Sequence, residues 1–561
     1  MRAPASGPER FIARAAAVTA VLTVASSVFG LARDQMIARL FGAGADTDAF
    51  LVAWTVPEMA STLLIEDAMA LVMIPAFSLA LSRRAARALD GPDADGLPDP
   101  VGRLLATTGP RLFIALACCA ALLAAAAPLV VRLLAPGLPD PRLAVQCTRL
   151  TAVTILTFGI AGYFSAALRA HQRFVPPAAI YVMYNLGILA TMLVLHAFWG
   201  VRAAAFGVAV GSALMVLVQL PAFLRHLPAR DFRPRRRARA VTRGATRTAT
   251  RAATRTAARA ADRPRTRRVR AHSSVLPTSL AVLAPVVIFA VSRQAQVLVE
   301  RFLASSLPSG AISHLNYAQK VAQMPMVLSL MICTVTFPIV VRAMADGQAD
   351  LARRRVERDL ALAGLVVLMG TAYVVAYAPQ LIQLLFQRGA FDTADTAATA
   401  SVMRVYALGL LGHSLASALV RPYFSGARPT WYPAAAMALG LLITVAAGAL
   451  AAPCWGVYGI AAANAVGISV TALLLLRGLG PQSIAVDVRA VALGLGRLAV
   501  AAALAAAAGW SLAALTSSAL AAAAAGCLVI PLAFTAVACF VRAPEVPLLI
   551  SSVKRKLCHG R

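Results

Sequence analysis

The fold of this chain is decided by the stretch S-V-F-G-L-A-R-D-Q-M-I-A-R-L-F-G-A-G-A-D-T-D-A-F, residues 27–50, and by the apolar run that follows it to Pro75. Both segments are hydrophobic enough to enter a bilayer, yet they carry ionisable side chains. Such groups are costly inside a membrane and therefore usually face a cavity or a partner. Pro57 interrupts the second run, which frees backbone groups that protein or water must satisfy. We therefore expect Arg33, Asp48 and Glu66 to line a polar pathway, the alternative being that such charges only anchor helix ends.

Composition places the chain in a membrane. It has 561 residues, of which 60% are hydrophobic and 14% charged, and its mean hydropathy is +0.75. A transmembrane helix needs about 20 apolar residues, and fourteen runs are long enough to span. We therefore predict an all-α polytopic membrane protein with about 14 transmembrane helices. The runs lie at roughly 12–32, 48–80, 111–135, 147–168, 175–198, 202–224, 274–303, 311–341, 359–386, 398–420, 430–452, 456–476, 490–514 and 517–541.

The formal net charge of +30 suggests a nucleic-acid partner at first sight, but its placement argues against one. Arginine clusters alternate with the apolar runs, as the positive-inside rule predicts for cytoplasmic loops. With the N-terminus in the cytoplasm, the outside loops are short, and two of them, 304–310 and 453–455, contain no Arg or Lys. We therefore expect both termini to be cytoplasmic.

Motifs for catalysis or metal binding are missing. The eight cysteines form no C-x-x-C pattern, and the seven histidines are scattered. No Ser-His-Asp, paired-carboxylate or metal-ligand cluster occurs, so we expect neither an enzyme nor a metal site. His413 lies within a predicted span, where packing explains it better than a proton relay.

The two halves of the chain resemble each other. Residues 200–211, G-V-R-A-A-A-F-G-V-A-V-G, match G-V-Y-G-I-A-A-A-N-A-V-G at 456–467, and A-P-L-V-V-R-L-L at 127–134 matches A-P-Q-L-I-Q-L-L at 378–385. The copies are six spans apart and so have the same orientation; such transporters bind their substrate between the two lobes. The expected units are an N-lobe with spans 1–6 (1–224), an Arg-rich cytoplasmic linker (225–272), a C-lobe with spans 7–12 (273–478), spans 13–14 (479–541) and a basic cytoplasmic tail (542–561).

The linker 225–272 contains seventeen arginines and two aspartates. Each basic residue near an anionic membrane surface contributes about 1 kcal/mol of attraction. The linker is therefore either a contact for anionic membrane lipids or a low-complexity spacer whose charge keeps it cytoplasmic. The spacer interpretation is the one we prefer.

The residues of the opening stretch, followed by V-P-E-M and then by I-P-A-F at 74–77, resemble the MurJ/MviN family of lipid II flippases in the multidrug/oligosaccharidyl-lipid/polysaccharide exporter superfamily. N-Y-A-Q-K-V (316–321) and L-L-F-Q-R-G-A-F (384–391) are similar to two further family segments. The resemblance implies a bacterial cytoplasmic membrane protein of peptidoglycan biosynthesis. It would move an undecaprenyl-pyrophosphate-linked cell-wall precursor, lipid II or a related lipid-linked glycan, from the inner to the outer leaflet by alternating access.

The resemblance also implies a V-shaped pair of lobes around a cationic cavity, with the lipid tail in a groove. A buried pyrophosphate needs fixed cationic donors, and arginine forks suit phosphate best. No cofactor is implied, although coupling to the membrane potential or to a monovalent cation is open, and cell-wall synthesis proteins are possible partners. The substrate-binding residues carried over are Arg33, Asp34, Asp48, Glu66 and Lys320, and Arg293 in span 7 could supply further charge.

The chain departs from the family in its cavity arginines. The family pattern has Arg where Ser27 stands, an Arg pair where Ser61 and Thr62 stand, and Asp-Arg where Gln319 and Lys320 stand. Three explanations remain: a paralogue for a different lipid-linked substrate, a flippase that uses other basic residues, or a member that does not transport. Glu300 and Arg301 in span 7 and Arg404 in span 10 are further charges that the cavity could use, although the first two could instead lie at an outer helix end.

Two other functions compete with the flippase. An ion-coupled drug or cation antiporter of the same superfamily would use Asp48 and Glu66 as proton or Na⁺ sites. A non-transporting scaffold would recruit cell-wall proteins and would tolerate the loss of every cavity charge.

Lys320 is the only lysine before the C-terminal tail, and it lies about ten residues into span 8. An unpaired ammonium there would be costly, so we expect it to face the cavity between the lobes, close to Asp48 or Glu66.

The predicted topology can be tested by cysteine labelling. Cys454 should lie at the outer face and Cys558 in the cytoplasmic tail, so an impermeant thiol reagent added to intact cells should label Cys454 alone. Each cysteine would be tested in an otherwise cysteine-free variant. Labelling of Cys558 but not Cys454 would reverse the topology.

Overall fold

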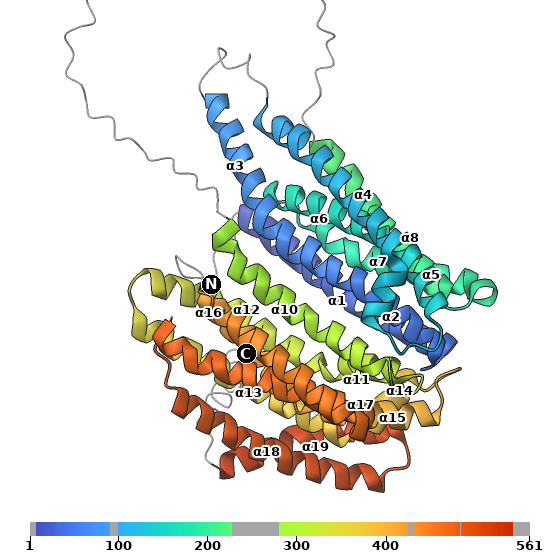
Figure 1. Cartoon of the computed structure of the whole chain (residues 1–561). Coiled ribbons are helices and arrows are strands. Elements are labelled where there is room, and N and C mark those ends of the chain that lie inside the picture. Colours follow the sequence, from blue (N-terminus) through green and yellow to red (C-terminus); the bar gives the residue numbers. More distant parts are fainter. Residues whose placement is uncertain (1–6, 90–98, 227–279, 425–429, 483, 542–561) are drawn as a thin grey trace, which may run out of the picture.

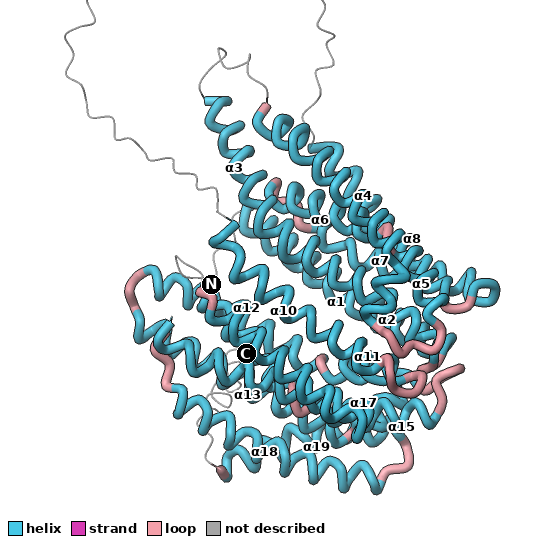
Figure 2. Tube along the Cα trace, in the orientation of Figure 1, coloured by secondary structure: helices cyan, strands magenta, loops and turns pink. Residues whose placement is uncertain are grey.

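The computed structural model describes residues 7–89, 99–226, 280–424, 430–482 and 484–541. Helices joined by short turns make up this part of the chain, and no strand occurs in it (Figure 2). The predicted all-α class is confirmed. The basic tail and all but the first two residues of the Arg-rich linker lie outside the described residues.

The first half of the chain forms one group of packed helices, which we call the N-lobe (Figure 1). A seven-residue π-helical turn, η1, separates its second and third helices. The elements are α1 (Gly7–Phe41), α2 (Ala45–Ser61), η1 (Thr62–Ala68), α3 (Met69–Leu89), α4 (Pro100–Leu134), α5 (Pro141–Thr151), α6 (Thr154–Ala170), α7 (Val175–Trp199) and α8 (Arg202–His226).

The second half forms the C-lobe, against which the last two helices pack (Figure 1). Its elements are α10 (Leu280–Ala304), α11 (Ala311–Ala322), α12 (Met324–Ala345), α13 (Ala349–Ala376), α14 (Ala378–Phe386), α15 (Thr393–Ala407), α16 (Leu410–Phe424) and α17 (Tyr432–Gln482). The final pair is α18 (Val488–Leu515) and α19 (Ala519–Phe540).

Each of the fourteen predicted apolar runs coincides with one helix, with successive helices, or with one half of α17. By length and composition, nine helical segments of the described residues could cross a membrane, with α2 joined to part of η1 and α5 joined to α6, and the number is ten if the bent pair α15–α16 counts as one span. Several of the other runs are broken into shorter helices, such as α11 and α12. At several predicted spans, the chain therefore forms two shorter helices and not one continuous helix. Such breaks place polar groups in the interior of the protein.

The break predicted at Pro57 has an unexpected form. Pro57 lies inside α2, and the irregular backbone is the π-helical turn η1, which begins five residues later. A proline at position 57 cannot donate to the carbonyl oxygen of Ala53. The Thr151 hydroxyl of α5 donates to that oxygen instead, at 3.3 Å. The freed backbone group is therefore satisfied by protein, as the membrane environment requires.

The internal repeat has matching backbone geometry. Gly200, between α7 and α8, has φ 55° and ψ −138°, and Gly456, inside α17, has φ 53° and ψ −132°. A positive φ of this kind favours glycine. Gly456 thus divides α17 into two helices that correspond to α7 and α8. In both pairs the helices touch through glycine, Gly211 facing Gly187 and Gly467 facing Gly440.

The two lobes meet mainly at one end, where α2, α11, α14 and α15 come together (Figure 1). Among the described residues, the hydrogen bonds between the lobes at this end link 39–48 and 137 in the N-lobe to 305–313 and 390–395 in the C-lobe. One hydrophobic core also continues from lobe to lobe there. We call this region the joint. A further hydrogen bond, from Lys320 to Asp34, lies at the opposite end of α11.

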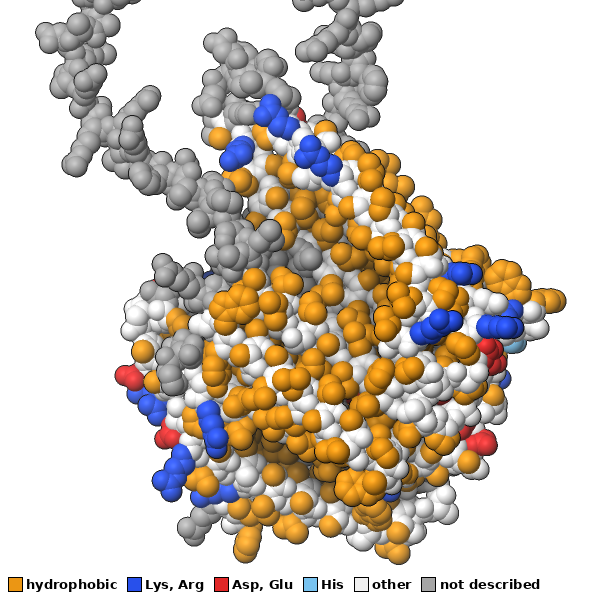
Figure 3. All heavy atoms as spheres, viewed as in Figure 1, with side chains coloured by type: hydrophobic (Ala, Val, Ile, Leu, Met, Phe, Trp, Pro, Cys, Tyr) orange, Lys and Arg blue, Asp and Glu red, His pale blue; other side chains and the backbone are white. Residues whose placement is uncertain are grey.

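The outer surface is largely apolar, with Lys and Arg concentrated at the two ends (Figure 3). Large hydrophobic side chains such as Phe198, Leu515 and Phe540 are more than 80% exposed. A water-soluble protein rarely exposes so continuous an apolar surface. Contact with lipid explains it.

The close packing of α7 on α8 predicts a glycine-specific effect. A Cβ atom at Gly211 would collide with the carbonyl oxygen of Tyr184, so Gly211→Ala should destabilise the protein by about 1–3 kcal/mol. The measurement is the midpoint of thermal unfolding in detergent. Gly496→Ala in α18 is the control, because nothing lies within 4 Å of its Cβ position. Equal midpoints for the two variants would contradict the packing.

Candidate functional site

Three charged side chains meet between the lobes. Arg33 Nη2 lies 2.8 Å from Asp34 Oδ1, and Lys320 Nζ lies 3.3 Å from Asp34 Oδ2. Arg33 and Asp34 belong to α1, whereas Lys320 lies in the last turn of α11. The carboxylate of Asp34 therefore bridges two cations that come from different lobes. We call Arg33, Asp34 and Lys320 the charge cluster.

Trp54 of α2 supports both cations. The Arg33 guanidinium carbon lies 4.3 Å from the centre of the indole ring, and Lys320 Nζ lies 4.8 Å from it. Cation–π contacts of this kind contribute about 1–2 kcal/mol when they are partly desolvated. The indole itself is fixed, because Trp54 Nε1 donates to the Tyr184 hydroxyl of α7 at 3.2 Å. The next residue, Asn185, accepts a hydrogen bond of 2.9 Å from Arg33 Nη1.

The charge cluster is buried but not neutral. The side chains of Arg33 and Asp34 are 11% exposed, and that of Lys320 is 26% exposed. Two cations and one carboxylate leave a formal charge of +1 in a poorly solvated place. Coulomb interactions strengthen as the local dielectric falls, so this excess positive charge favours an anion, and Lys320 is the more exposed of the two cations.

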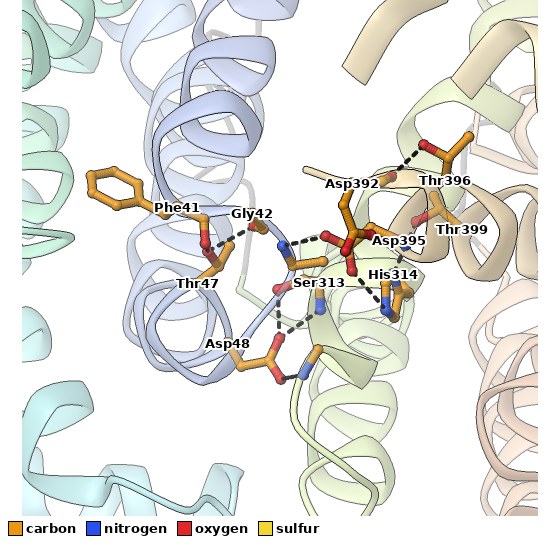
Figure 4. Close-up of polar contacts among 12 residues, drawn as sticks. Phe41, Gly42, Thr47, Asp48, Ser313, His314, Asp392, Asp395, Thr396 and Thr399 are labelled. Atoms are coloured by element: carbon orange, nitrogen blue, oxygen red, sulfur yellow. Dashed lines mark hydrogen bonds and ion pairs between the residues drawn. The ribbon is translucent and has the colours of Figure 1, made fainter. Parts of the chain in front are cut away.

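Asp48 belongs to the joint and not to the charge cluster (Figure 4). Its Oδ2 accepts from the backbone N–H of Gly310 at 2.7 Å, and its Oδ1 accepts from the N–H and the hydroxyl of Ser313, at 2.8 and 2.5 Å. Gly310 is the N-cap of α11. A carboxylate of the N-lobe thus caps a C-lobe helix, where the helix dipole favours negative charge.

A second carboxylate connects the lobes in the opposite direction (Figure 4). Asp395 of α15 accepts from the backbone N–H of Ala43 at 3.3 Å, and it lies 3.8 Å from His314 Nε2. His314 Nδ1 in turn lies 2.9 Å from the Thr399 hydroxyl. The joint also contains a backbone hydrogen bond of 2.9 Å from Ala390 to Arg39. The stretch 39–48 therefore forms part of the contact surface between the two lobes.

The remaining predicted site residues lie apart from the charge cluster. Glu66, in η1, is exposed and accepts a hydrogen bond of 2.9 Å from the Tyr181 hydroxyl. Arg293 of α10 is exposed and takes part in none of the ion pairs of the described residues. Lys320 pairs with Asp34, so the expectation that it lies beside Asp48 or Glu66 was wrong. The reason is the depth of Lys320, at the α11–α12 break and level with Arg33, whereas Asp48 meets the first turn of α11.

The other charges considered for the cavity lie elsewhere. Arg404 stacks on Trp510 of α18 at 3.9 Å and donates to the Val375 carbonyl at 3.1 Å. Glu300 and Arg301 are 2% and 3% exposed, so they do not lie at a solvated helix end. Arg301 donates to the Ile312 carbonyl and to Asn316, at 3.0 and 2.9 Å.

Glu300 forms a second buried polar group inside the C-lobe. Asn464 donates to Glu300, and His413 Nε2 lies 3.0 Å from Asn464 Oδ1. His413 therefore has a polar partner, which the packing interpretation did not foresee. This group connects α10, α16 and α17 and is separate from the charge cluster.

Sequence reasoning missed Trp54, Tyr184 and Asn185. A tryptophan and a tyrosine inside apolar runs are typical of ordinary core packing, and so carried no signal. Asn185 was a usable signal, because an amide inside a membrane span usually has a polar partner. Within the described residues, no three His, Cys, Asp or Glu side chains are placed to hold a metal ion.

An apolar groove of about 440 Å³ lies in the C-lobe. It is lined by Val321 of α11, the residue that follows Lys320, and by side chains of α12, α13, α14 and α19, including Gly526 and Ile530. No residue of the charge cluster is among its lining residues. Its size and apolar lining suit a hydrocarbon chain.

Comparison with known proteins gives a consistent answer. The family described as lipid II flippase MurJ matches residues 37–525. A protein of Burkholderia cenocepacia named lipid II flippase MurJ is 28% identical over 482 residues, 84% of each chain. A protein of Rhizobium meliloti named probable lipid II flippase MurJ is 26% identical over 500 residues, which cover 87% of this chain and 84% of that one.

Solved structures support the fold. A structure described as lipid II flippase MurJ in an inward closed conformation aligns with a TM-score of 0.71 and 18% identity, over 95% of this chain and 99% of the other. An inward-facing multidrug resistance MATE transporter aligns with a TM-score of 0.61 and 12% identity, over 85% and 99%. At these identities the likeness concerns the fold alone.

The bridging role of Asp34 predicts that removing its charge destabilises the protein more than removing the charge of an exposed carboxylate does. Asp34→Asn leaves Arg33 and Lys320 facing each other without a counterion, which should cost about 3–5 kcal/mol of stability. Asp46→Asn removes an exposed carboxylate nearby and should change little. Thermal unfolding in detergent compares the two. If Asp34→Asn unfolds at the wild-type temperature, the carboxylate does not hold the cluster together.

Proposed function

This chain belongs to the lipid II flippase MurJ family, and we propose that it moves an undecaprenyl-pyrophosphate-linked peptidoglycan precursor, lipid II or a close relative, across the membrane. The substrate passes from the inner to the outer leaflet by alternating access of the two lobes. Such movement needs no covalent chemistry, in keeping with a chain that is not an enzyme.

The observation that carries the proposal is the bridging of Arg33 and Lys320 by Asp34. A pyrophosphate that enters between the lobes can replace Asp34 as the counterion of both cations. Arginine offers a planar fork and lysine a point charge, and both bind phosphate oxygens. Since the two cations come from different lobes, an anion bound to both of them interacts with both lobes at the same time.

The apolar groove lined by Val321, α12, α13, α14 and α19 is the proposed path of the polyprenyl tail. A tail lying against α19 keeps its carbon chain out of the charged region while the pyrophosphate is at Lys320. Burial of each methylene contributes about 0.8 kcal/mol. A long isoprenoid is therefore held mainly by the apolar groove, and the charges fix its position.

The joint is the proposed outer gate. The topology predicted from loop charges places residues 304–310 at the outer face, and this segment leads into Gly310, the partner of Asp48. In this orientation the lobes are closed to the outside. Opening outward then requires Asp48 to leave the N-terminus of α11 and Asp395 to leave Ala43.

Because three of the family's cavity arginines are absent, only a few cations of this chain are proposed to bind the substrate. Ser27 is exposed and donates to the Thr23 carbonyl at 3.2 Å, and Ser61 and Thr62 both donate to the carbonyl of Glu58, at 2.9 and 3.3 Å. None of these hydroxyls replaces a guanidinium. Arg33 and Lys320 are thus the proposed phosphate donors, with Arg293 as an additional cation on α10. Glu66 is proposed to contact the uncharged parts of the substrate.

The antiporter alternative assigns a proton or Na⁺ to Asp48. Both oxygens of Asp48 already accept hydrogen bonds from α11, and this favours a gate over a free ion site. A functional test distinguishes the scaffold alternative from the flippase. A scaffold should tolerate the loss of the Lys320 charge, whereas a flippase should not.

Substitution of Lys320 tests the proposal. Lys320→Arg keeps the charge and the phosphate contact, so it should retain most transport, whereas Lys320→Gln should reduce transport at least tenfold at normal protein abundance. The assay is complementation of a conditional lipid II flippase mutant, with immunoblotting of the membrane fraction. Arg142→Gln, which removes an exposed arginine of α5, is the control.

A fully active Lys320→Gln variant would refute a cationic phosphate site at this position. If Lys320→Gln instead lowers abundance, and Asp34→Asn in the same chain restores it, then the pair is structural and does not bind phosphate.

A further inference from the structure

A second basic cavity lies at the joint end of the N-lobe, away from the charge cluster. Its volume is about 440 Å³, and it is lined by Gln146, Arg149 and Leu150 of α5 together with Trp199 and Arg202 at the α7–α8 turn. Both arginines are exposed, and neither takes part in the ion pairs of the described residues.

The helix end of α8 adds to the positive potential of this cavity, whereas the carboxylate of Asp140 opposes it without forming an ion pair. Arg202 is the first residue of α8, a helix of 25 residues whose N-terminal end favours anions. The acidic residue at the start of α5, Asp140, accepts hydrogen bonds from the backbone N–H groups of Arg142 and Leu143, at 3.0 and 3.1 Å. Asp140 thus caps α5 and forms no ion pair with the two arginines.

The internal repeat shows that the arginines are not needed for the turn. The same tripeptide, Trp-Gly-Val, stands at 199–201 and at 455–457, and its glycines have nearly the same φ and ψ. In the C-lobe copy, Tyr458 replaces Arg202. At the offset of 251 residues that relates 127–134 to 378–385, Arg149 corresponds to the buried Ala400. The fold builds this corner without either arginine, so their presence in the N-lobe calls for another reason.

The cavity adjoins the lipid-facing side of α7. Leu193, Val194 and Phe198 are 60%, 69% and 82% exposed and lead along α7 to Trp199. Tryptophan is enriched at the level of lipid headgroups, where its ring is apolar and its N–H is polar. Figure 3 shows Lys and Arg side chains at this end of the molecule beside the apolar surface. A ligand in the cavity therefore meets charge on one side and acyl chains on the other.

We propose that this cavity binds the phosphodiester headgroup of an anionic phospholipid. Arg149 and Arg202 approach the phosphate from two helices, Trp199 lies at the glycerol level, and the acyl chains follow the exposed face of α7. Two arginine forks suit a phosphate better than they suit a zwitterionic headgroup, whose ammonium they repel. In the proposed topology the lipid belongs to the outer leaflet, so this site differs from the Arg-rich linker on the opposite side.

Native mass spectrometry of the full-length protein tests the proposal. Wild type and variants, purified in detergent, are titrated with dioleoyl phosphatidylglycerol or with dioleoyl phosphatidylcholine. Wild type should retain one tightly held phosphatidylglycerol that Arg149→Gln/Arg202→Gln binds at least tenfold more weakly. Arg149→Lys/Arg202→Lys keeps the charge and should bind nearly as wild type does, and Arg142→Gln is the control on the same helix. The linker is present in every variant, so its contribution cancels.

Three results would overturn the proposal. These are equal binding of phosphatidylglycerol by wild type and the Gln double variant, equal binding of the two lipids by wild type, or displacement of the lipid by millimolar inorganic phosphate, which would indicate a site for the free anion. Thermal unfolding in phosphatidylcholine establishes that each variant is folded. If the Gln double variant is unfolded, the two single Gln variants replace it, and each should lose part of the affinity.

Discussion

The structure depends on one electrostatic constraint: a cation that enters the membrane interior needs a counterion. Asp34 supplies that counterion for Arg33 and for Lys320, which come from different lobes. Leaving either cation unpaired would cost several kcal/mol, so the two lobes cannot separate at this level without compensation. In the proposed function, a pyrophosphate provides the compensation. Substrate binding and lobe movement would then be coupled through the single carboxylate of Asp34.

The duplicated architecture explains why a gate can form at one end. Each lobe contains a glycine-packed helix pair, α7–α8 or the two halves of α17, which cannot deform without collisions at Gly211 or Gly467. The joint, by contrast, combines a hydrophobic core shared by the lobes with a few hydrogen bonds from side chains to helix ends, such as Asp48 to α11. In the proposed function, these hydrogen bonds are the contacts that outward opening would break. Rigid lobes connected at one end are the arrangement that rocking of one lobe against the other requires.

Much of the fold followed from the sequence because membrane constraints are strict. The apolar runs and the repeat with Gly200 over Gly456 rest on local length and spacing. The partner of Lys320 could not be predicted from the sequence, because it depends on the depth in the membrane at which α11 ends relative to α1. The burial of Glu300 beside Asn464 also depends on packing between distant helices. Trp54 was not identified from the sequence for a simpler reason, because an aromatic residue in an apolar run usually belongs to the hydrophobic core.

A transporter must release its substrate as well as bind it, and a small number of cavity arginines is compatible with both requirements. In the proposed function, a site that held a pyrophosphate with many fixed cations would bind it tightly and release it slowly. Arg33 and Lys320 are the two proposed donors, and Asp34 would compete with the phosphate for both. After the phosphate left, Asp34 would again pair with both cations and keep two buried positive charges from repelling each other. We infer that this carboxylate weakens the bound state and stabilises the empty one, so that a chain with Ser27, Ser61 and Thr62 in place of arginines would bind the substrate more weakly and release it faster.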